Sequence, residues 1–283
     1  MRRFLLSAVG LLLALPAFAL PAFATPAFAA PASNSPTCTV IADAATDAVL
    51  FRDGPSCDKP VSPFSTFKIA LAVIGFDSGL LKDAHAPAIP YDPALNVSLE
   101  PWRHTTDPTR WMQYSVVWYS QDLTRKLGME RFRDSVDALA YGNRDVSGDP
   151  GKDNGLSRAW LSSSLKISPM AQIGFLGRLG RGELPVSEEA QALALAVQPV
   201  FTVADDWVVR GKTGNGLQRR ADGSLDEARQ IGWFVGWAEK QGRRVSFARL
   251  LEDDGPRQGP ASFAARDTML ADLPILLASE TMK

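Results

Sequence analysis

Strand patterns lie at both ends of this chain, and helical patterns lie between them. Near the N-terminal end, residues 38–51 alternate enough in hydropathy to predict two strands with a turn near residues 44–47. Residues 215–226 are predicted as the turn between the first two strands of a C-terminal group. The strands of that group are expected at residues 207–211, 230–238 and 243–251. This order predicts an α/β (α+β) fold, with one antiparallel sheet built from both chain ends and flanked by helices.

Helical patterns fill most of the middle of the chain. Asp107 is a predicted N-cap followed by a first-turn proline, and that helix is expected to stop at Gly128. Other helices are predicted at residues 65–81, 130–139, 168–179, 187–197 and 262–277. We expect residues of about 85–198 to form an inserted all-helical subdomain. A cleft between this subdomain and the sheet is the expected place for a ligand.

The first 30 residues have the three parts of a secretory signal peptide. Two arginines precede an apolar run over residues 4–15, and small residues follow it. Cleavage is expected after Ala24 or in the stretch Ala29-Ala30. The apolar run is shorter than the roughly 20 residues needed to span a bilayer. We therefore expect a periplasmic protein of one catalytic domain, residues 31–283, without a membrane anchor after cleavage.

Composition excludes several classes of function. The chain has 30 basic and 31 acidic residues, a balance that gives no electrostatic footprint for nucleic acid or an anionic membrane. With only two histidines and two cysteines, no metal site is expected. After export, Cys38 and Cys57 are expected to pair, with two separate thiols as the alternative.

The pattern Ser-x-x-Lys occurs three times, and its context differs at each place. Ser56 follows a Gly-Pro turn, and Ser163 lies in a polar run of three serines. Only Ser65 opens a long apolar segment that is predicted to be helical. The pairs Ser56/Lys59 and Ser163/Lys166 are therefore expected to be coincidental.

The spacing of Ser65 and Lys68 suits nucleophilic catalysis. A serine hydroxyl is a poor nucleophile until a nearby base takes its proton. Three positions apart on a helix, Ser65 and Lys68 face the same side. The apolar residues that follow Lys68 predict burial, which disfavours the ammonium form and leaves an amine that can act as a base. Free backbone N–H groups at the helix start can hold a developing oxyanion.

Three further segments carry polar groups suited to the same chemistry, although each has an ordinary structural alternative. Ser115, in the sequence SVV, is a candidate proton relay, or a solvent-facing helix serine. Residues 212–214, KTG, offer a cation and a hydroxyl for a carboxylate, or form a plain strand-to-turn junction. Residues 141–143, YGN, are candidates for a cleft wall, or for a helix-ending turn.

Taken together, STFK, SVV, YGN and KTG in this order resemble the class D, oxacillinase-type serine β-lactamases. The resemblance extends over nearly the whole mature chain and includes Trp160-Leu161 and the strand at residues 232–237. It implies the fold shared by serine β-lactamases and penicillin-binding proteins. Valines follow Ser115, where class A enzymes have Ser-Asp-Asn, which argues against class A.

The resemblance implies a role for each residue of the site. Ser65 is the acylated nucleophile, and Lys68 carries a CO₂-derived carbamate (N6-carboxylysine) that serves as general base. CO₂ or bicarbonate is needed for this modification, and no other cofactor is implied. Trp160 is expected to support the carbamate through its indole N–H. Val117 and Leu161 are expected to control access of the deacylating water.

Substrate contacts are also implied by the resemblance. The N–H groups of Ser65 and Asn215 would form the oxyanion hole, although many relatives have an aromatic residue in place of Asn215. The β-lactam is expected to be held by a set of side chains and one glycine: Lys212, Thr213, Gly214, Arg266, Tyr141 and Asn143.

The expected function is hydrolysis of β-lactam antibiotics, which gives resistance. Two alternatives use the same fold: a β-lactam-sensing domain that stays acylated, and a D,D-peptidase acting on peptidoglycan. The expected partner is a small-molecule β-lactam, and both a monomer and a homodimer remain open.

Overall fold

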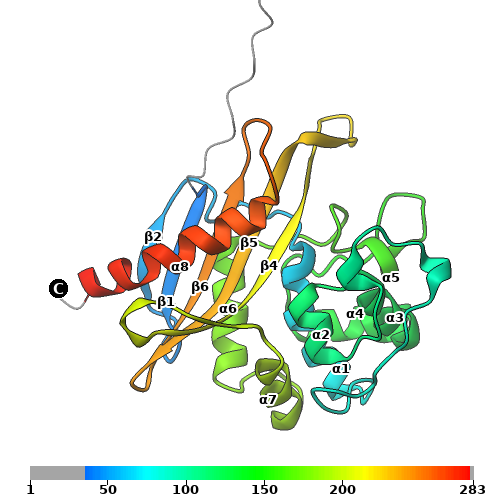
Figure 1. Ribbon diagram of the computed structural model, residues 1–283, viewed down its shortest axis with the longest axis horizontal. Coiled ribbons are helices and arrows are strands. Elements are labelled where there is room, and N and C mark those ends of the chain that lie inside the picture. The colour runs from blue at the N-terminus through cyan, green and yellow to red at the C-terminus, as the bar shows by residue number, and fades with distance from the viewer. Residues whose placement is uncertain (1–35, 281–283) are drawn as a thin grey trace, which may run out of the picture.

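The computed structural model describes residues 36–280, and its centre is a six-stranded antiparallel sheet in the order β2-β1-β6-β5-β4-β3 (Figure 1). The strands are β1 (Cys38–Asp43), β2 (Val49–Asp53), β3 (Val200–Thr202), β4 (Val208–Arg219), β5 (Leu225–Lys240) and β6 (Arg243–Glu252). β1 pairs with β6, so the predicted sheet built from both chain ends is confirmed. The predicted signal peptide and its cleavage sites lie outside the described residues.

The helices begin where short polar side chains cap them. Asp107, Ser168 and Ser187 each accept a hydrogen bond from a backbone N–H three residues on, as expected of N-caps. The 3₁₀ helices are η1 (Phe64–Phe67), η2 (Pro93–Leu95), η3 (Glu100–Trp102) and η4 (Ala204–Asp206). The α-helices are α1 (Lys68–Asp77), α2 (Pro108–Tyr114), α3 (Val117–Leu127), α4 (Met129–Ala138), α5 (Gly155–Arg158), α6 (Pro169–Gly180), α7 (Glu188–Ala196) and α8 (Ala261–Glu280).

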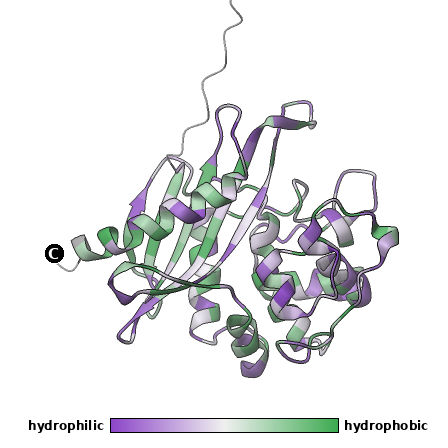
Figure 2. Ribbon diagram, viewed as in Figure 1, coloured by the Kyte–Doolittle hydropathy of each residue, from purple (hydrophilic) through white to green (hydrophobic). Residues whose placement is uncertain are grey.

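Both faces of the sheet are covered, so its central strands are buried on both sides. Successive side chains of a strand point to opposite faces, and Leu250 and Leu251 of β6 accordingly enter different hydrophobic clusters. α8 packs on one face, and α6 packs against β1 and β6 on the other (Figure 1). Figure 2 shows hydrophobic residues along the central strands. This two-sided core makes the sheet a firm support for a site at its edge.

Cys38 and Cys57 form a disulfide bond, and both are fully buried. The predicted pairing is confirmed, and the alternative of two separate thiols is wrong. The bond joins the start of β1 to the segment that leads into η1.

Within residues 36–280, no helix is long and apolar enough to cross a membrane, and no cluster of three or more His, Cys, Asp or Glu side chains could hold a metal ion.

The predicted turn at residues 215–226 is wrong. β4 continues to Arg219 and β5 begins at Leu225, so the turn is confined to residues 220–224. Asn215 lies within β4 and pairs with Gly232 of β5. The glycines of β4 interrupt its hydropathy pattern, and only pairing with β5 reveals the strand.

The helix expected at residues 65–81 consists of η1 and α1 and ends at Asp77.

Candidate active site

Ser65 and Lys68 meet where η1 joins α1. The Nζ of Lys68 donates a hydrogen bond to the Oγ of Ser65 at 3.3 Å. Lys68 is only 1% exposed, and no ion pair of its amine is found among the described residues. Burial, together with the charge of Lys212, holds the pKa of Lys68 well below its ordinary value. The predicted pairing of a nucleophile with a neutral amine therefore has the required geometry.

The other two Ser-x-x-Lys matches do not form serine–lysine pairs. The side chains of Ser56 and Lys59 both bond to Glu252, and the two residues are joined only by a backbone hydrogen bond. Ser163 donates to Asp149, whereas Lys166 donates to Ser62 at 2.9 Å. The prediction that both matches are coincidental agrees with these contacts.

Lys212 of β4 and Ser115 form a second lysine–serine pair in the same site. The Nζ of Lys212 donates to the Oγ of Ser115 at 3.1 Å and lies 3.1 Å from the carbonyl oxygen of Thr213. Burial lowers the pKa of Lys212 to about 7. Ser115 ends α2 with a φ of 58°, in the left-handed region. A non-glycine residue is uncommon there and is often found at a functional position.

Two glycines let β4 lie directly against η1. A Cβ atom at Gly214 would lie 2.7 Å from the carbonyl oxygen of Pro63 and 3.2 Å from the N of Thr66. A Cβ at Gly216 would lie 1.9 Å from the ring of Phe64. A side chain at either position would push the strand away. Asn215, between the two glycines, is therefore held beside the turn that carries Ser65.

Trp160 is fully buried beside η1, and its indole N–H has no hydrogen-bond partner among the described residues. The indole stacks on Phe67, with ring centroids 5.5 Å apart. The carbonyl oxygen of Trp160 accepts a hydrogen bond from the N–H of Phe64, which ties this segment to η1. Most buried donors in proteins are paired, so this orphan N–H marks a place where an acceptor would be stabilised.

Tyr141 and Asn143 have structural contacts. Tyr141 is fully buried, packs against Phe67 at 5.3 Å and accepts a hydrogen bond from Gln172. It supports the site from behind, so the expected substrate contact of Tyr141 is wrong because its ring has no exposed surface. The amide of Asn143 donates to the carbonyl oxygen of Ser164. A contact between Asn143 and substrate stays a prediction.

Val117 and Leu161 are both half-buried, at the start of α3 and directly after Trp160. Their control over the access of water to the acyl-enzyme stays a prediction.

Thr213 is half-buried, and its Oγ1 lies 3.5 Å from the Nζ of Lys212. The hydroxyl and the amine can therefore act on one anion.

Arg266, the residue predicted to bind the substrate carboxylate, lies in α8. Its Nε donates to Asp267 at 2.7 Å, and its guanidinium lies over the ring of Phe263. Its role stays a prediction. A second arginine, Arg257, lies in the loop between β6 and α8 and forms a buried ion pair with Asp253 at 2.6 Å. The sequence does not predict a role for Arg257, because an arginine in a polar loop carries no distinctive signal.

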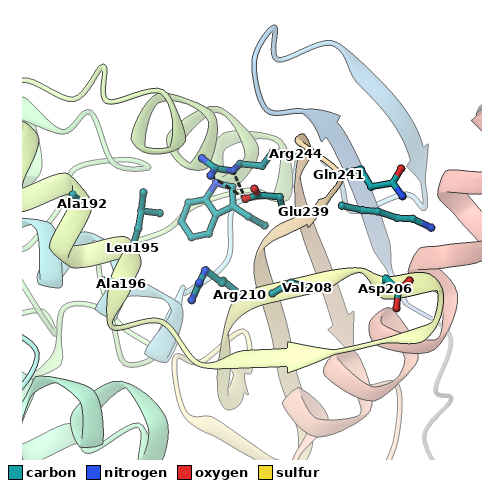
Figure 3. Close-up of a pocket in the computed structure, with 11 residues that line it drawn as sticks. Ala192, Leu195, Ala196, Asp206, Val208, Arg210, Glu239, Gln241 and Arg244 are labelled. Atoms are coloured by element: carbon teal, nitrogen blue, oxygen red, sulfur yellow. Dashed lines mark hydrogen bonds and ion pairs between the residues drawn. The ribbon is translucent and has the colours of Figure 1, made fainter.

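One cavity lies away from these groups. It has a volume of about 620 Å³ and lies between α7, the start of β4 and the end of β5 (Figure 3). Leu195 and Arg210 line it, and an ion pair between Glu239 and Arg244 closes one side. Ser65 and Lys68 do not line it. The grouping of two buried lysines with two serines, and not cavity size, identifies the candidate active site.

Comparisons with known proteins identify the family of this chain. The penicillin-binding protein transpeptidase domain family matches residues 37–273. β-Lactamase OXA-9 of Klebsiella pneumoniae is 46% identical over 244 residues, which cover 86% of this chain and 89% of that protein. The chain belongs to the class D β-lactamases.

Other members of the family show the same relationship. β-Lactamase OXA-1 of Escherichia coli is 34% identical over 76% of this chain and 75% of that protein. The crystal structure of OXA-427, a class D β-lactamase, matches with a TM-score of 0.79 at 45% identity. The matched region covers 86% of this chain and 99% of the OXA-427 chain. The fold predicted from the resemblance to class D enzymes is therefore confirmed.

Proposed function

We propose that this protein hydrolyses the amide bond of β-lactam antibiotics through a serine acyl-enzyme, and so confers resistance as a periplasmic enzyme. The observation that carries the proposal is the hydrogen bond between the buried amine of Lys68 and the hydroxyl of Ser65. A buried amine whose pKa is held well below its ordinary value can take the proton of the serine. The names of the related proteins, β-lactamases of class D, support the same reaction.

Acylation begins with attack of the Ser65 oxygen on the lactam carbonyl carbon. A C–O bond forms, and the serine proton leaves toward Lys68. The N–H groups of Ser65 and Asn215 are proposed to hold the oxyanion. When the C–N bond breaks, the leaving nitrogen takes a proton from the Oγ of Ser115, and the proton that Lys68 accepted from Ser65 is relayed back to that oxygen. Lys212 donates a hydrogen bond to that oxygen and stabilises the charge that develops on it.

The surroundings of Lys68 fit a carbamate on its Nζ. The amine is buried with a lowered pKa, and only a neutral amine captures CO₂. The N–H of Trp160, which has no partner in the part of the chain that the structure describes, is a suitable donor to the new carboxylate oxygen. When present, the carbamate supplies a base for the serine proton and for the water that attacks the acyl-enzyme. Val117 and Leu161 then limit how that water reaches the ester.

Substrate carboxylates are proposed to lie at the KTG segment. Lys212 and the Oγ1 of Thr213 offer a cation and a hydroxyl close together. Gly214 has no side chain, which lets the substrate and η1 approach the strand. Arg266 is proposed to add a second cation from α8.

Turnover of a chromogenic cephalosporin by the purified protein tests this proposal. The intact enzyme should hydrolyse many equivalents, whereas a sensor domain would give one stoichiometric burst. Ser65→Ala should abolish acylation, which is detected as a mass increase of the protein. Ser163→Ala is the matched control, because this serine also begins a Ser-x-x-Lys match but contacts Asp149. Full activity of Ser65→Ala would refute the proposal.

A further inference from the structure

Two side-chain amides connect the part of β4 beside Ser65 with the start of α8. The Nδ2 of Asn215 donates to the Oε1 of Gln230 at 3.0 Å, and its Oδ1 accepts from the N–H of Ser262 at 2.9 Å. The Oε1 of Gln230 also accepts from the N–H of Ala261 at 3.1 Å. The Nε2 of Gln230 donates to the carbonyl oxygen of Gly259 at 3.1 Å. All four polar atoms of these two amides are therefore engaged.

These bonds replace the usual cap of a helix. The first N–H groups of a helix have no partner within the helix, and a polar N-cap side chain usually accepts from one of them. α8 begins at Ala261 and follows Pro260, which has no side-chain acceptor. Asn215 and Gln230 supply the acceptors from β4 and β5 instead. The start of α8 is thus bound to the strand that lies against η1 (Figure 1).

Asn215 is held from three directions. Its backbone pairs with Gly232 of β5, and Gly232 lies against the start of α8, because a Cβ there would be 2.3 Å from the carbonyl carbon of Ala261. Its neighbour Gly214 lies against Pro63 of the turn before Ser65. The side-chain amide supplies the third constraint, toward α8 and Gln230. The peptide plane that carries the N–H of Asn215 therefore has little freedom to rotate.

We propose that Gln230 is a positioning residue for the oxyanion hole. Through the side chain of Asn215, it fixes the direction of the Asn215 N–H relative to the N–H of Ser65. Gln230 itself touches neither the substrate nor Ser65. Its effect is on the transition state, because donors fixed in advance stabilise a developing oxyanion without reorganisation. This inference rests on the proposed acyl-enzyme chemistry of Ser65.

Gln230→Leu tests the inference, since it keeps the side-chain size and removes the amide. Loss of one oxyanion donor typically lowers kcat by about 100- to 1,000-fold. A donor that is misdirected but still present should lower the acylation rate constant less, by about tenfold. Substrate binding before acylation should change little. The affinity for a boronic acid transition-state analogue should fall by the same factor, which a purely structural role would not produce.

Gln218→Leu is the matched control. Gln218 lies on β4, as Asn215 does. Its Nε2 donates to the carbonyl oxygens of Gln230 and Asp253, but its side chain does not contact the side chain of Asn215. It should alter stability without changing acylation or boronate affinity. Gln230→Glu should rescue most of the activity, because it keeps an oxygen for Asn215 and Ala261, and it serves if Gln230→Leu does not fold.

A double variant shows whether Gln230 acts through Asn215. Adding Gln230→Leu to Asn215→Ala should slow acylation no further, because the connecting amide is already gone. Wild-type acylation and boronate affinity in Gln230→Leu, or additive losses in the double variant, would overturn the inference. Absence of β-lactam turnover in the wild-type enzyme would instead refute the proposed function.

Discussion

Trp160→Phe isolates the contribution of one buried N–H group. Within residues 36–280 the indole N–H of Trp160 has no partner, while its ring stacks on Phe67 at 5.5 Å and lies edge-on to Phe132 at 6.3 Å. A phenyl ring keeps an aromatic contact at this place and removes only the donor and some volume. If Lys68 carries a carbamate, the indole N–H is the donor that becomes satisfied on modification.

The size of the effect follows from the energy of that bond. A hydrogen bond to a charged acceptor contributes about 1.5–3 kcal/mol. Each 1.4 kcal/mol corresponds to about a tenfold change in an equilibrium constant. The bicarbonate concentration that half-saturates Lys68 should therefore rise by about 10- to 150-fold in Trp160→Phe. Deacylation should slow in parallel at low bicarbonate and recover as bicarbonate is raised.

Titration with ¹³C-labelled bicarbonate measures this change, with the carbamate signal and the steady-state rate followed in one sample. Trp237→Phe is the control, because Trp237 is also buried but its N–H already bonds to the carbonyl oxygen of Leu176. It should titrate as the wild-type protein does. Equal half-saturation in Trp160→Phe and the wild type would refute the role of the indole, and no carbamate signal in the wild type would refute the modification itself.

Three other predictions concern charge, the disulfide and substrate binding. Burial lowers the pKa of Lys212 from 10.5 to about 7, so between these values the unfolded chain binds more protons than the folded one. The free energy of unfolding should therefore rise with pH across this window, and Lys212→Met should flatten the rise in urea titrations. Replacing Cys38 and Cys57 by alanine should lower the free energy of unfolding by about 3 kcal/mol, measured by denaturant unfolding, with activity of the folded enzyme retained. Arg266→Ala should raise KM for substrates that carry a carboxylate and leave kcat nearly unchanged, whereas Arg257→Ala should chiefly lower stability, because Arg257 neutralises the buried Asp253. An unchanged KM in Arg266→Ala would remove Arg266 from the site.

Short-range features of the fold could be predicted from the sequence, whereas long-range ones could not. Asp107 and Ser187 mark helix starts because an N-cap bonds to an N–H only three residues away. The second half of β4 was missed because Gly214 and Gly216 break its hydropathy pattern. Those glycines are required by the close approach of η1, which is about 150 residues away in the chain. No local pattern reports such a contact.

The candidate site shows the same difference between short-range contacts, which the sequence predicts, and long-range contacts, which it does not. Ser65 and Lys68 could be paired from spacing alone, because one helical turn brings them together. The contact of Ser115 with Lys212 spans 97 positions, and no local pattern predicts it. Gln230 was missed as a site residue because its amide acts on Asn215 across a strand pair. A glutamine on a strand gives no chemical signal until its partners are known.

The two buried lysines explain why one site can hold both a base and a cation. Burial lowers the pKa of both amines, and the charge of Lys212 lowers the pKa of Lys68 further. Repulsion between two ammonium groups therefore favours a state in which Lys68 is neutral and Lys212 is protonated. Conversion of the Lys68 amine to an anionic carbamate would turn that repulsion into attraction, because a negative group would then face the Lys212 ammonium. The same arrangement thus favours the neutral amine before modification and the anion after it, which agrees with the proposed roles of Lys68 as the base and of Lys212 as the substrate-binding cation.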